Sequence, residues 1–229
     1  LKKEIQKAKA MTDGVLGVNI MVALTNFSNL VKTSIEEGID IIFAGAGLPL
    51  NLPQYLTEGA KTKLVPIVSS GRAAKILCSK WKGLFDYLPD AIVVEGPKAG
   101  GHLGFKREQL DDPDFALEKL LPEVVEQVKY FEEKYRTKIP VIAAGGIYTG
   151  GDIKNIMDMG ASGVQMGTRF VTTDECDASM DFKQTYIDSK EEDMEIVNSP
   201  VGMPGRAIFN EFIAKVRRGE KRPIKCPYQ

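Results

Sequence analysis

The chain has 229 residues, a length that fits one domain or one large α/β barrel. It carries 30 Lys and Arg residues against 31 Asp and Glu residues, so its formal net charge of −1 provides no overall attraction to nucleic acid or to an anionic membrane. The longest apolar runs, 15–24 and 139–147, are too short to cross a bilayer. We therefore expect one unit with neither nucleic acid nor a membrane as its partner.

The sequence shows no metal-binding or disulfide pattern. The three cysteines, Cys78, Cys176 and Cys226, are odd in number and have no C-x-x-C spacing, which argues against a disulfide framework or a zinc site and favours a reducing compartment. His102 is the only histidine, so imidazole groups cannot form a metal cluster. We expect a cytoplasmic protein that binds no metal.

Short apolar segments alternate with amphipathic ones along the chain. Six of the apolar segments are rich in β-branched residues and predict strands at 17–24, 39–47, 63–70, 91–96, 139–146 and 163–170. Their nearly continuous hydrophobicity is typical of parallel strands whose two faces are both covered by helices. Helices are predicted at 30–35, at 122–135 with Pro122 in the first turn, at 153–157 after a Thr149 cap, and at 207–218.

A doubly wound open sheet and a (β/α)8 TIM-type barrel both fit this repetition of βα units. Glycine or serine lies at nearly every strand end, at Gly45, Gly47, Ser70, Gly96, Gly145 and Gly167. A barrel builds its active site at these carboxyl ends, so we favour the barrel. Six of its eight strands are visible, and the first two are expected before Leu1.

The pattern weakens after the sixth strand. We expect the partial barrel to cover residues 1–171. The polar, acidic stretch 172–204 predicts a small helical excursion outside the barrel. Residues 205–229 are predicted to contain the closing helix and a basic tail.

A glycine-rich loop follows the fourth predicted strand, within Glu95–Gly104. Gly100, Gly101 and Gly104 let the backbone approach a flat or phosphorylated ligand closely, and they surround the only histidine. A lone histidine in a surface loop is more often structural, but its place at a strand end favours a catalytic role for His102. Lys98 and Glu95, in the same loop, are candidates for an ion pair of small effect.

Two further turns close the fifth and sixth predicted strands, in Ala143–Ile147 and Gln165–Arg169. Either turn alone is most simply explained by glycines in tight turns. Together, beside the amino ends of helices, their backbone amides predict a phosphate cradle of the kind that barrels form after their last two strands.

These motifs resemble those of the nitronate monooxygenase family, whose scaffold the flavin-dependent enoyl-ACP reductase II shares. The resemblance is carried by Gly17–Met21, Glu95–Gly104, Ala143–Ile147 and Gln165–Phe170, and it extends from about residue 1 to residue 215. It implies a (β/α)8 barrel that holds FMN at its carboxyl end, with residues 1–171 as the FMN-binding part.

The resemblance also implies roles for individual residues. His102 would face the reactive part of the flavin ring, and Ser199–Arg206 would lie near the substrate opening. The residues implied to bind the cofactor are Asn19, Glu95 and Gly100 along the flavin, and Gly145, Gly146, Gln165, Met166, Gly167 and Thr168 at its phosphate. Two features depart from the family: no glycine-rich turn matches that of its first strand, and Lys98 stands where many members have Glu.

Three functions follow as alternatives. The first is FMN-dependent oxidation of alkyl nitronates with O2, in which His102 binds the nitro group or acts as a base. The second is an NAD(P)H-dependent reductase of enoyl thioesters that uses the same flavin. The third is a barrel that binds a phosphorylated ligand without catalysis. We favour the first, with a small-molecule substrate and a homodimer as a candidate assembly.

Overall fold

The computed structural model describes residues 1–199 and 202–220. In chain order its helices and strands are α1 (Lys2–Met11), β1 (Gly17–Met21), α2 (Phe27–Glu36), β2 (Ile41–Gly45), β3 (Lys63–Val68), α3 (Gly71–Phe85), β4 (Ile92–Glu95), β5 (Gly101–His102), α4 (Leu117–Tyr135), β6 (Val141–Ala144), α5 (Gly150–Asp158), β7 (Gly163–Gln165), α6 (Thr168–Val171), α7 (Met180–Asp188), β8 (Met194–Asn198), β9 (Pro204–Ile208) and α8 (Glu211–Arg217). Short 3-10 helices lie at η1 (Leu52–Tyr55), η2 (Arg107–Gln109), η3 (Pro113–Phe115) and η4 (Glu191–Asp193).

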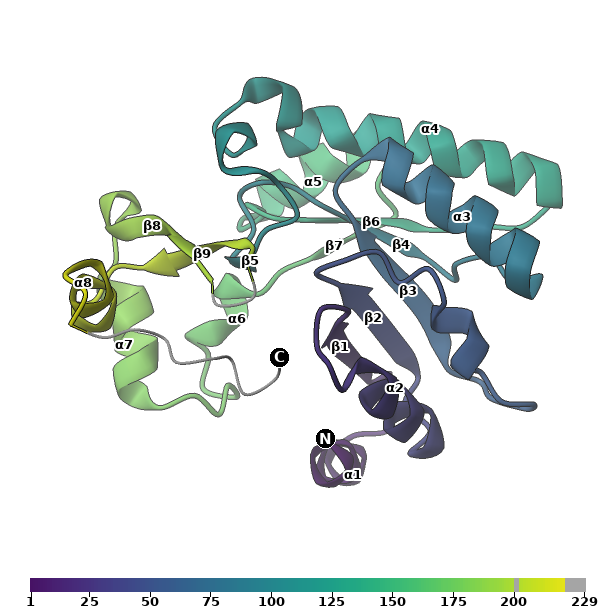
Figure 1. Ribbon diagram of the computed structural model, residues 1–229, viewed down its shortest axis with the longest axis horizontal. Helices are drawn as coiled ribbons and strands as arrows, with labels where there is room; N and C mark the ends of the chain where they lie inside the picture. The colour runs from purple at the N-terminus through teal and green to yellow at the C-terminus, as the bar shows by residue number, and fades with distance from the viewer. Residues whose placement is uncertain (200–201, 221–229) are drawn as a thin grey trace.

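Six parallel strands form the main sheet, in the order β1-β2-β3-β4-β6-β7 (Figure 1). Each pairs in parallel with its neighbours, so all six carboxyl ends meet at one edge of the sheet. The six strands predicted from the sequence are therefore confirmed. The sixth was predicted too long: pairing with β6 ends at Gln165, and the chain turns at Gly167 into α6.

The two faces of this sheet are covered differently. The larger apolar cluster joins Ile42 and Val94 of the strands to Leu77 of α3 and Val124 of α4. The smaller cluster lies on the other face of the sheet. Its buried residues all come from the strands or from positions next to them, and none comes from a helix: Val65, Ala91, Val93 and Ala144. The predicted cover of helices on both faces is thus wrong, because the sheet is a parallel half-barrel with the helices on one face. The two strands expected before Leu1 stay a prediction.

The helices follow the sequence closely. The predicted helices at 30–35 and 153–157 are α2 and α5, and the Thr149 side chain caps α5 by accepting from the Asp152 amide at 3.1 Å. The helix predicted at 122–135 begins five residues earlier, at Leu117. Pro122 therefore lies inside α4, where its missing N–H removes one hydrogen bond near the start of a long helix. Among the described residues, no helix is long and apolar enough to cross a membrane.

The chain after β7 forms a small unit beside the half-barrel, which we call the hairpin unit (168–217). It contains α6, α7, α8 and the β8–β9 hairpin, and β5 joins that hairpin in a three-stranded antiparallel sheet (Figure 1). The prediction of a helical excursion at 172–204 is wrong in part, since the strand β8 lies there besides α7 and the 3-10 helix η4.

The closing helix was also predicted too early, at 207–218. Residues 204–208 form β9 instead, because they pair in register with Met194–Asn198 of β8. The helix α8 begins only at Glu211, after Asn210, whose side chain accepts from the Ile213 amide at 3.0 Å.

Candidate active site

The glycine-rich loop after β4 carries His102 to the edge where the strands of the half-barrel end. Gly101 adopts a φ of +73°, which bends the loop toward the hairpin unit. Gly101 and His102 then pair with Arg206 and Gly205 of β9, and the Leu103 amide donates to the Pro204 carbonyl at 2.9 Å. The backbone of His102 is therefore fixed by a strand more than a hundred residues later in the chain.

Arg206 adds a side-chain contact to the same loop. Its Nη2 donates to the Pro97 carbonyl at 2.9 Å and its Nε donates to the Ala99 carbonyl at 3.2 Å. A guanidinium presents several donors in a rigid plane, so one side chain can hold two successive carbonyls of a turn. The sequence placed Arg206 near the substrate opening but carried no signal for this contact.

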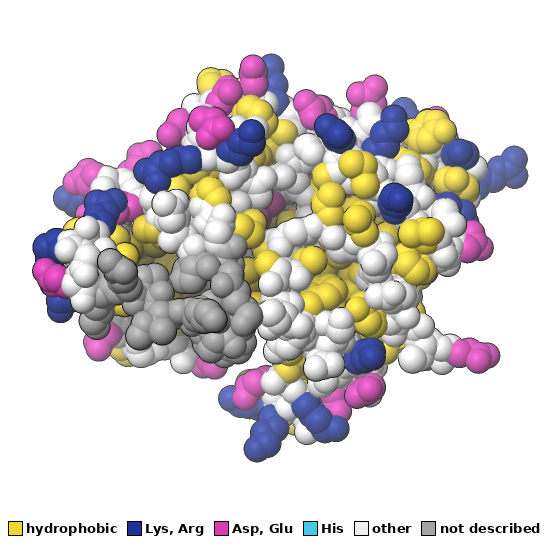
Figure 2. Space-filling view, in the orientation of Figure 1, with side chains coloured by type: hydrophobic (Ala, Val, Ile, Leu, Met, Phe, Trp, Pro, Cys, Tyr) yellow, Lys and Arg dark blue, Asp and Glu magenta, His cyan; other side chains and the backbone are white. Residues whose placement is uncertain are grey.

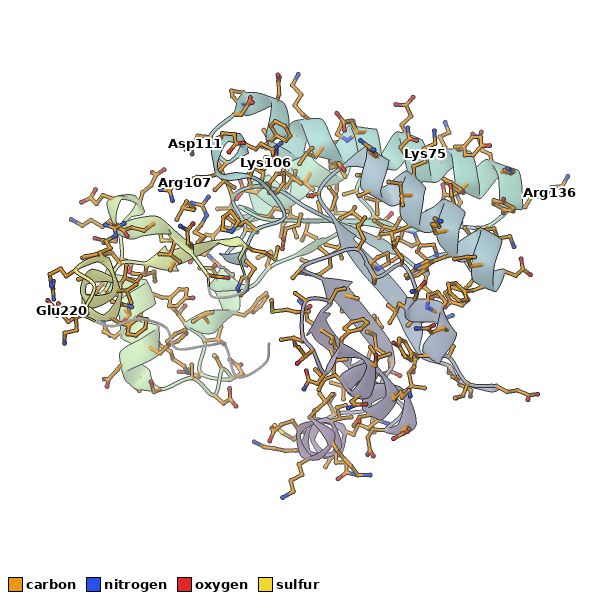
Figure 3. All side chains as sticks on the ribbon, in the orientation of Figure 1. Lys75, Lys106, Arg107, Asp111, Arg136 and Glu220 are labelled. Carbon is orange, nitrogen blue, oxygen red and sulfur yellow. The ribbon has the colours of Figure 1, made fainter. Side chains whose placement is uncertain are left out.

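The hairpin unit also touches the segment after His102. Lys106 and Arg107 lie near the middle of the molecule, where this segment approaches the hairpin unit, between Glu220 at one end and Arg136 at the other (Figure 3). Arg107 Nη1 donates to the Ile196 carbonyl of β8 at 3.2 Å. In the space-filling view, charged side chains of both signs are scattered over the visible face of both parts (Figure 2).

At least four cavities border the loop. One, of about 460 Å³, is lined by Pro97 and Lys98 together with residues of α4 and α5. The other three contain Gly100 or His102. The glycine cavity, of about 460 Å³, lies over the ends of β4, β6 and β7. The histidine cavity, of about 520 Å³, contains His102 and the end of β3. The arginine cavity, of about 590 Å³, lies between His102 and α8 and is lined by Arg107, Arg206 and Arg217. Each volume is within the range of small-molecule sites.

The glycine cavity gathers eight of the nine residues predicted to bind a cofactor: Glu95, Gly100, Gly145, Gly146, Gln165, Met166, Gly167 and Thr168. Asn19 is the exception, because it lies on β1 at the far edge of the sheet and does not line this cavity. Tyr148 and Tyr186 also line it. Tyr148 directly follows a predicted motif, whereas Tyr186 comes from α7 and had no signal in the sequence.

Backbone amides line this cavity without internal acceptors. Within the part of the chain that the structure describes, no hydrogen bond uses the amides of residues 145–147 or 166–168 as donors. Gly145 has a φ of +97°, and a Cβ there would lie 2.9 Å from the Gly96 carbonyl oxygen, so the close approach of the two turns requires glycine. Two adjacent turns with free donors are a suitable place for an anion.

At the amino end of α5, an acidic side chain binds two amides beside these turns. The amides of Tyr148 and Thr149 both donate to the Asp152 carboxylate, at 3.1 and 2.8 Å. These hydrogen bonds lower the pKa of Asp152. These two amides are thus already satisfied, and the phosphate cradle stays a prediction.

Glu95 lies at the end of β4, between the glycine cavity and the histidine cavity. Burial raises the pKa of its carboxyl to about 7. No ion pair joins it to Lys98 in the described residues, so the predicted ion pair is not formed. Glu95 can therefore present a protonated carboxyl to a ligand near neutral pH.

The two described cysteines, Cys78 and Cys176, line none of these cavities. Cys78 is fully buried in α3, and burial raises its thiol pKa to about 12, so it is a core residue. Cys176 is also free, and Cys226 lies outside the described residues. Within residues 1–199 and 202–220, no group of His, Cys, Asp and Glu side chains has the arrangement of a metal site.

Comparison with known proteins shows to which family the chain belongs. The family model of nitronate monooxygenase matches residues 1–229. The chain belongs to the nitronate monooxygenase family. A probable nitronate monooxygenase from Staphylococcus saprophyticus is 32% identical over 212 residues, 91% of this chain and 55% of the relative. The (3aS,4S,5R,7aS)-5-hydroxy-7a-methyl-1-oxo-octahydro-1H-indene-4-carboxyl-CoA dehydrogenase from Mycobacterium tuberculosis is 29% identical over 221 residues, 96% of this chain and 56% of that relative.

Solved structures of family relatives have the same fold. FabK from Thermotoga maritima aligns with a TM-score of 0.75 at 30% identity, over 96% of this chain and 62% of that one. Nitroalkane oxidase from Streptomyces ansochromogenes aligns with a TM-score of 0.72 at 23% identity, over 93% and 67%, a likeness of fold alone. The chain thus spans little more than half of the two curated family relatives described above.

Proposed function

We propose that this chain is the FMN-binding, histidine-bearing part of an oxidoreductase that oxidises alkyl nitronates with O2. The observation that carries the proposal is the glycine cavity, where unused backbone amides face the loop that holds His102. Membership of the nitronate monooxygenase family supports it. Eight of the nine residues predicted to bind the cofactor line this cavity, and His102 lines the adjoining histidine cavity.

The residues of the glycine cavity fit the phosphate end of FMN. The amides of 145–147 and 166–168 would donate to the phosphate oxygens, and Gly100 with Glu95 would lie along the rest of the cofactor. When bound, FMN supplies the electron acceptor for the two electrons that leave the nitronate, and O2 is the final oxidant. The chain itself would bind the ligands, orient them and limit the access of water.

His102 is the residue that we assign to the substrate. Its ring lines the histidine cavity, which also contains Glu95 and the apolar side chains of Leu103 and Phe105. The imidazole would hold the nitro group of the nitronate anion. Where the substrate is a neutral nitroalkane, a ring nitrogen would accept the proton from the carbon next to the nitro group.

The test is the visible absorption spectrum of the full-length protein, followed by anaerobic addition of propionate 3-nitronate and, separately, of NADH. We expect flavin bands that bleach with the nitronate and change little with NADH. Absence of flavin bands and of FMN binding would overturn the proposal and leave a barrel that binds another phosphorylated ligand.

The His102→Ala variant tests the assignment of the histidine. It should retain FMN, because His102 does not line the glycine cavity, and it should lose turnover by roughly 100-fold or more. Full activity of this variant would contradict the role of His102 while leaving the cofactor proposal intact.

A second function, reduction of an enoyl thioester with NAD(P)H, is supported by the 30% identity to FabK, an enoyl-ACP reductase II. The relative named as a carboxyl-CoA dehydrogenase also points to thioester substrates. Rapid bleaching by NADH in the experiment above, with none by the nitronate, would favour this reductase.

A further inference from the structure

The turn between β8 and β9 places a serine against the ring of His102. Ser199 directly follows β8, and its Oγ lies 2.9 Å from His102 Nε2. The turn fixes the serine from both sides: the Ser199 amide donates to the Met203 carbonyl, and the Gly202 amide donates to the Ser199 carbonyl, each at 3.0 Å. The hydroxyl is therefore held in position before any ligand binds.

This hydroxyl is the sole hydrogen-bond partner of the His102 ring within residues 1–199 and 202–220. A serine hydroxyl can donate to an unprotonated ring nitrogen or accept from a protonated one, so this contact holds the position of Nε2 in either tautomer. His102 also lines both the histidine cavity and the arginine cavity. Without this partner, no hydrogen bond from the described residues would hold the ring between the two cavities.

We propose that Ser199 is a positioning residue that holds the His102 ring in one orientation. The inference rests on the proposed role of His102 in the oxidation of nitronates. Ser199 acts through the imidazole and has no assigned contact with substrate. The hairpin unit thereby holds the histidine twice, through β5–β9 pairing of its backbone and through Ser199 at its ring.

The sequence makes a direct measurement of the ring straightforward, because His102 is the only histidine of the chain. Long-range 1H–15N correlation spectra of the full chain, labelled with 15N-histidine, produced without a histidine tag and recorded where the ring is neutral, report the two ring nitrogens. In the wild type we expect the Nε2 shift of a nitrogen that is hydrogen-bonded to a hydroxyl. In Ser199→Ala the Nε2 shift should change, because this nitrogen loses its hydroxyl partner.

Two further variants separate positioning from general damage. Ser199→Thr keeps a hydroxyl and should restore the wild-type Nε2 shift. Ser189→Ala is the matched control: it removes a hydroxyl of the hairpin unit that donates to the Thr185 carbonyl and lines none of the three cavities, so the shifts of His102 should not change. Identical ring shifts in the wild type and Ser199→Ala would overturn the inference.

Kinetics provide the second readout. Loss of one hydrogen bond to the imidazole should lower kcat for nitronate oxidation by about five- to tenfold, with the Kd for FMN unchanged because Ser199 does not line the glycine cavity. An unchanged kcat together with altered ring shifts would contradict a role of the positioning in catalysis. If no variant oxidises nitronates, the proposed function fails, whereas the ring spectra still decide whether Ser199 holds the His102 ring.

Discussion

The half-barrel and the hairpin unit are built in different ways. The half-barrel holds a continuous core in which side chains such as Trp81, Leu77 and Ile42 are completely buried. In the described part of the hairpin unit, no hydrophobic side chain reaches that degree of burial, and large apolar side chains such as Phe182 stay half exposed. Stability of the chain therefore comes mainly from the half-barrel.

The hairpin unit supplies contacts that hold the proposed catalytic loop, 96–102, which carries His102. The loop 96–102 leaves the sheet after β4 and has glycine at several positions, so its own conformational preferences are weak. Pairing with β9 and the contacts of Arg206 and Ser199 restrict it. Substitutions in the half-barrel should therefore mainly lower the free energy of unfolding, whereas substitutions in the hairpin unit should mainly lower the catalytic rate.

The largest contrast is expected between two aromatic residues. Trp81 is fully buried and its Nε1 donates to the Pro49 carbonyl at 3.0 Å, so Trp81→Ala should lower the free energy of unfolding by about 3–5 kcal/mol. Phe182→Ala, in the hairpin unit, removes a side chain that is 50% exposed and should cost about 1 kcal/mol or less. Urea denaturation measures both. Equal losses would show that the hairpin unit has a core of comparable importance.

The cradle belongs to the half-barrel, and Gly145→Ala tests it. An alanine there would combine a φ of +97° with a Cβ 2.9 Å from the Gly96 oxygen, and should cost roughly 2–3 kcal/mol of stability and at least about tenfold in FMN affinity. Gly163→Ala is the control, because its Cβ would meet no atom within 4 Å. Fluorescence titration with FMN compares them. Equal affinity of the two variants would show that the cradle does not hold the phosphate.

Glu95 should make the half-barrel sensitive to pH. Burial raises the carboxyl pKa to about 7 in the folded protein, above its usual value, so the folded state retains a proton that the unfolded state has released. The contribution of Glu95 to stability is therefore present at low pH and is lost as the pH rises through the folded pKa. Glu95→Gln should be more stable than the wild type by on the order of 2 kcal/mol at about pH 8, with a much smaller difference at about pH 4.

Chemical denaturation of the protein without FMN at these two pH values checks this expectation. A constant difference between the wild type and Glu95→Gln across the range would show that the carboxyl is not perturbed in the folded protein.

The smallest effect on stability is expected at Arg206. Arg206→Ala removes two hydrogen bonds to the catalytic loop and should lower kcat/KM by about tenfold, with the free energy of unfolding changed by about 1 kcal/mol or less. Arg206→Lys keeps the charge and one donor, and should recover part of the activity. Steady-state kinetics and urea denaturation of the same preparations compare the two quantities. A large loss of stability with unchanged kcat/KM would reverse the roles assigned to the two parts.

The half-barrel was predictable because its signals are local. An uninterrupted apolar run indicates a buried parallel strand, and a glycine after it indicates a turn at the edge of the sheet. This reasoning placed His102 and the two turns, 143–147 and 165–169, at one edge from the sequence alone, and the structure brings them to adjoining cavities. The helix ends followed from caps such as Thr149.

Only the tertiary structure determined the contacts that hold the loop. His102 and Ser199 are 97 residues apart, and Arg206 reaches carbonyls 107 and 109 residues away. Residues 207 and 208 were predicted as the start of a helix, because the strand character of 204–208 depends on pairing with β8 and β5 and not on its own residues. The sequence also did not reveal that the Asp152 carboxylate accepts from two amides before α5. Nor did it reveal that burial raises the pKa of Glu95. Apolar periodicity and turn residues are properties of neighbouring positions and can be seen in the sequence, whereas hydrogen bonding between distant segments and burial of a charge depend on how the whole chain folds.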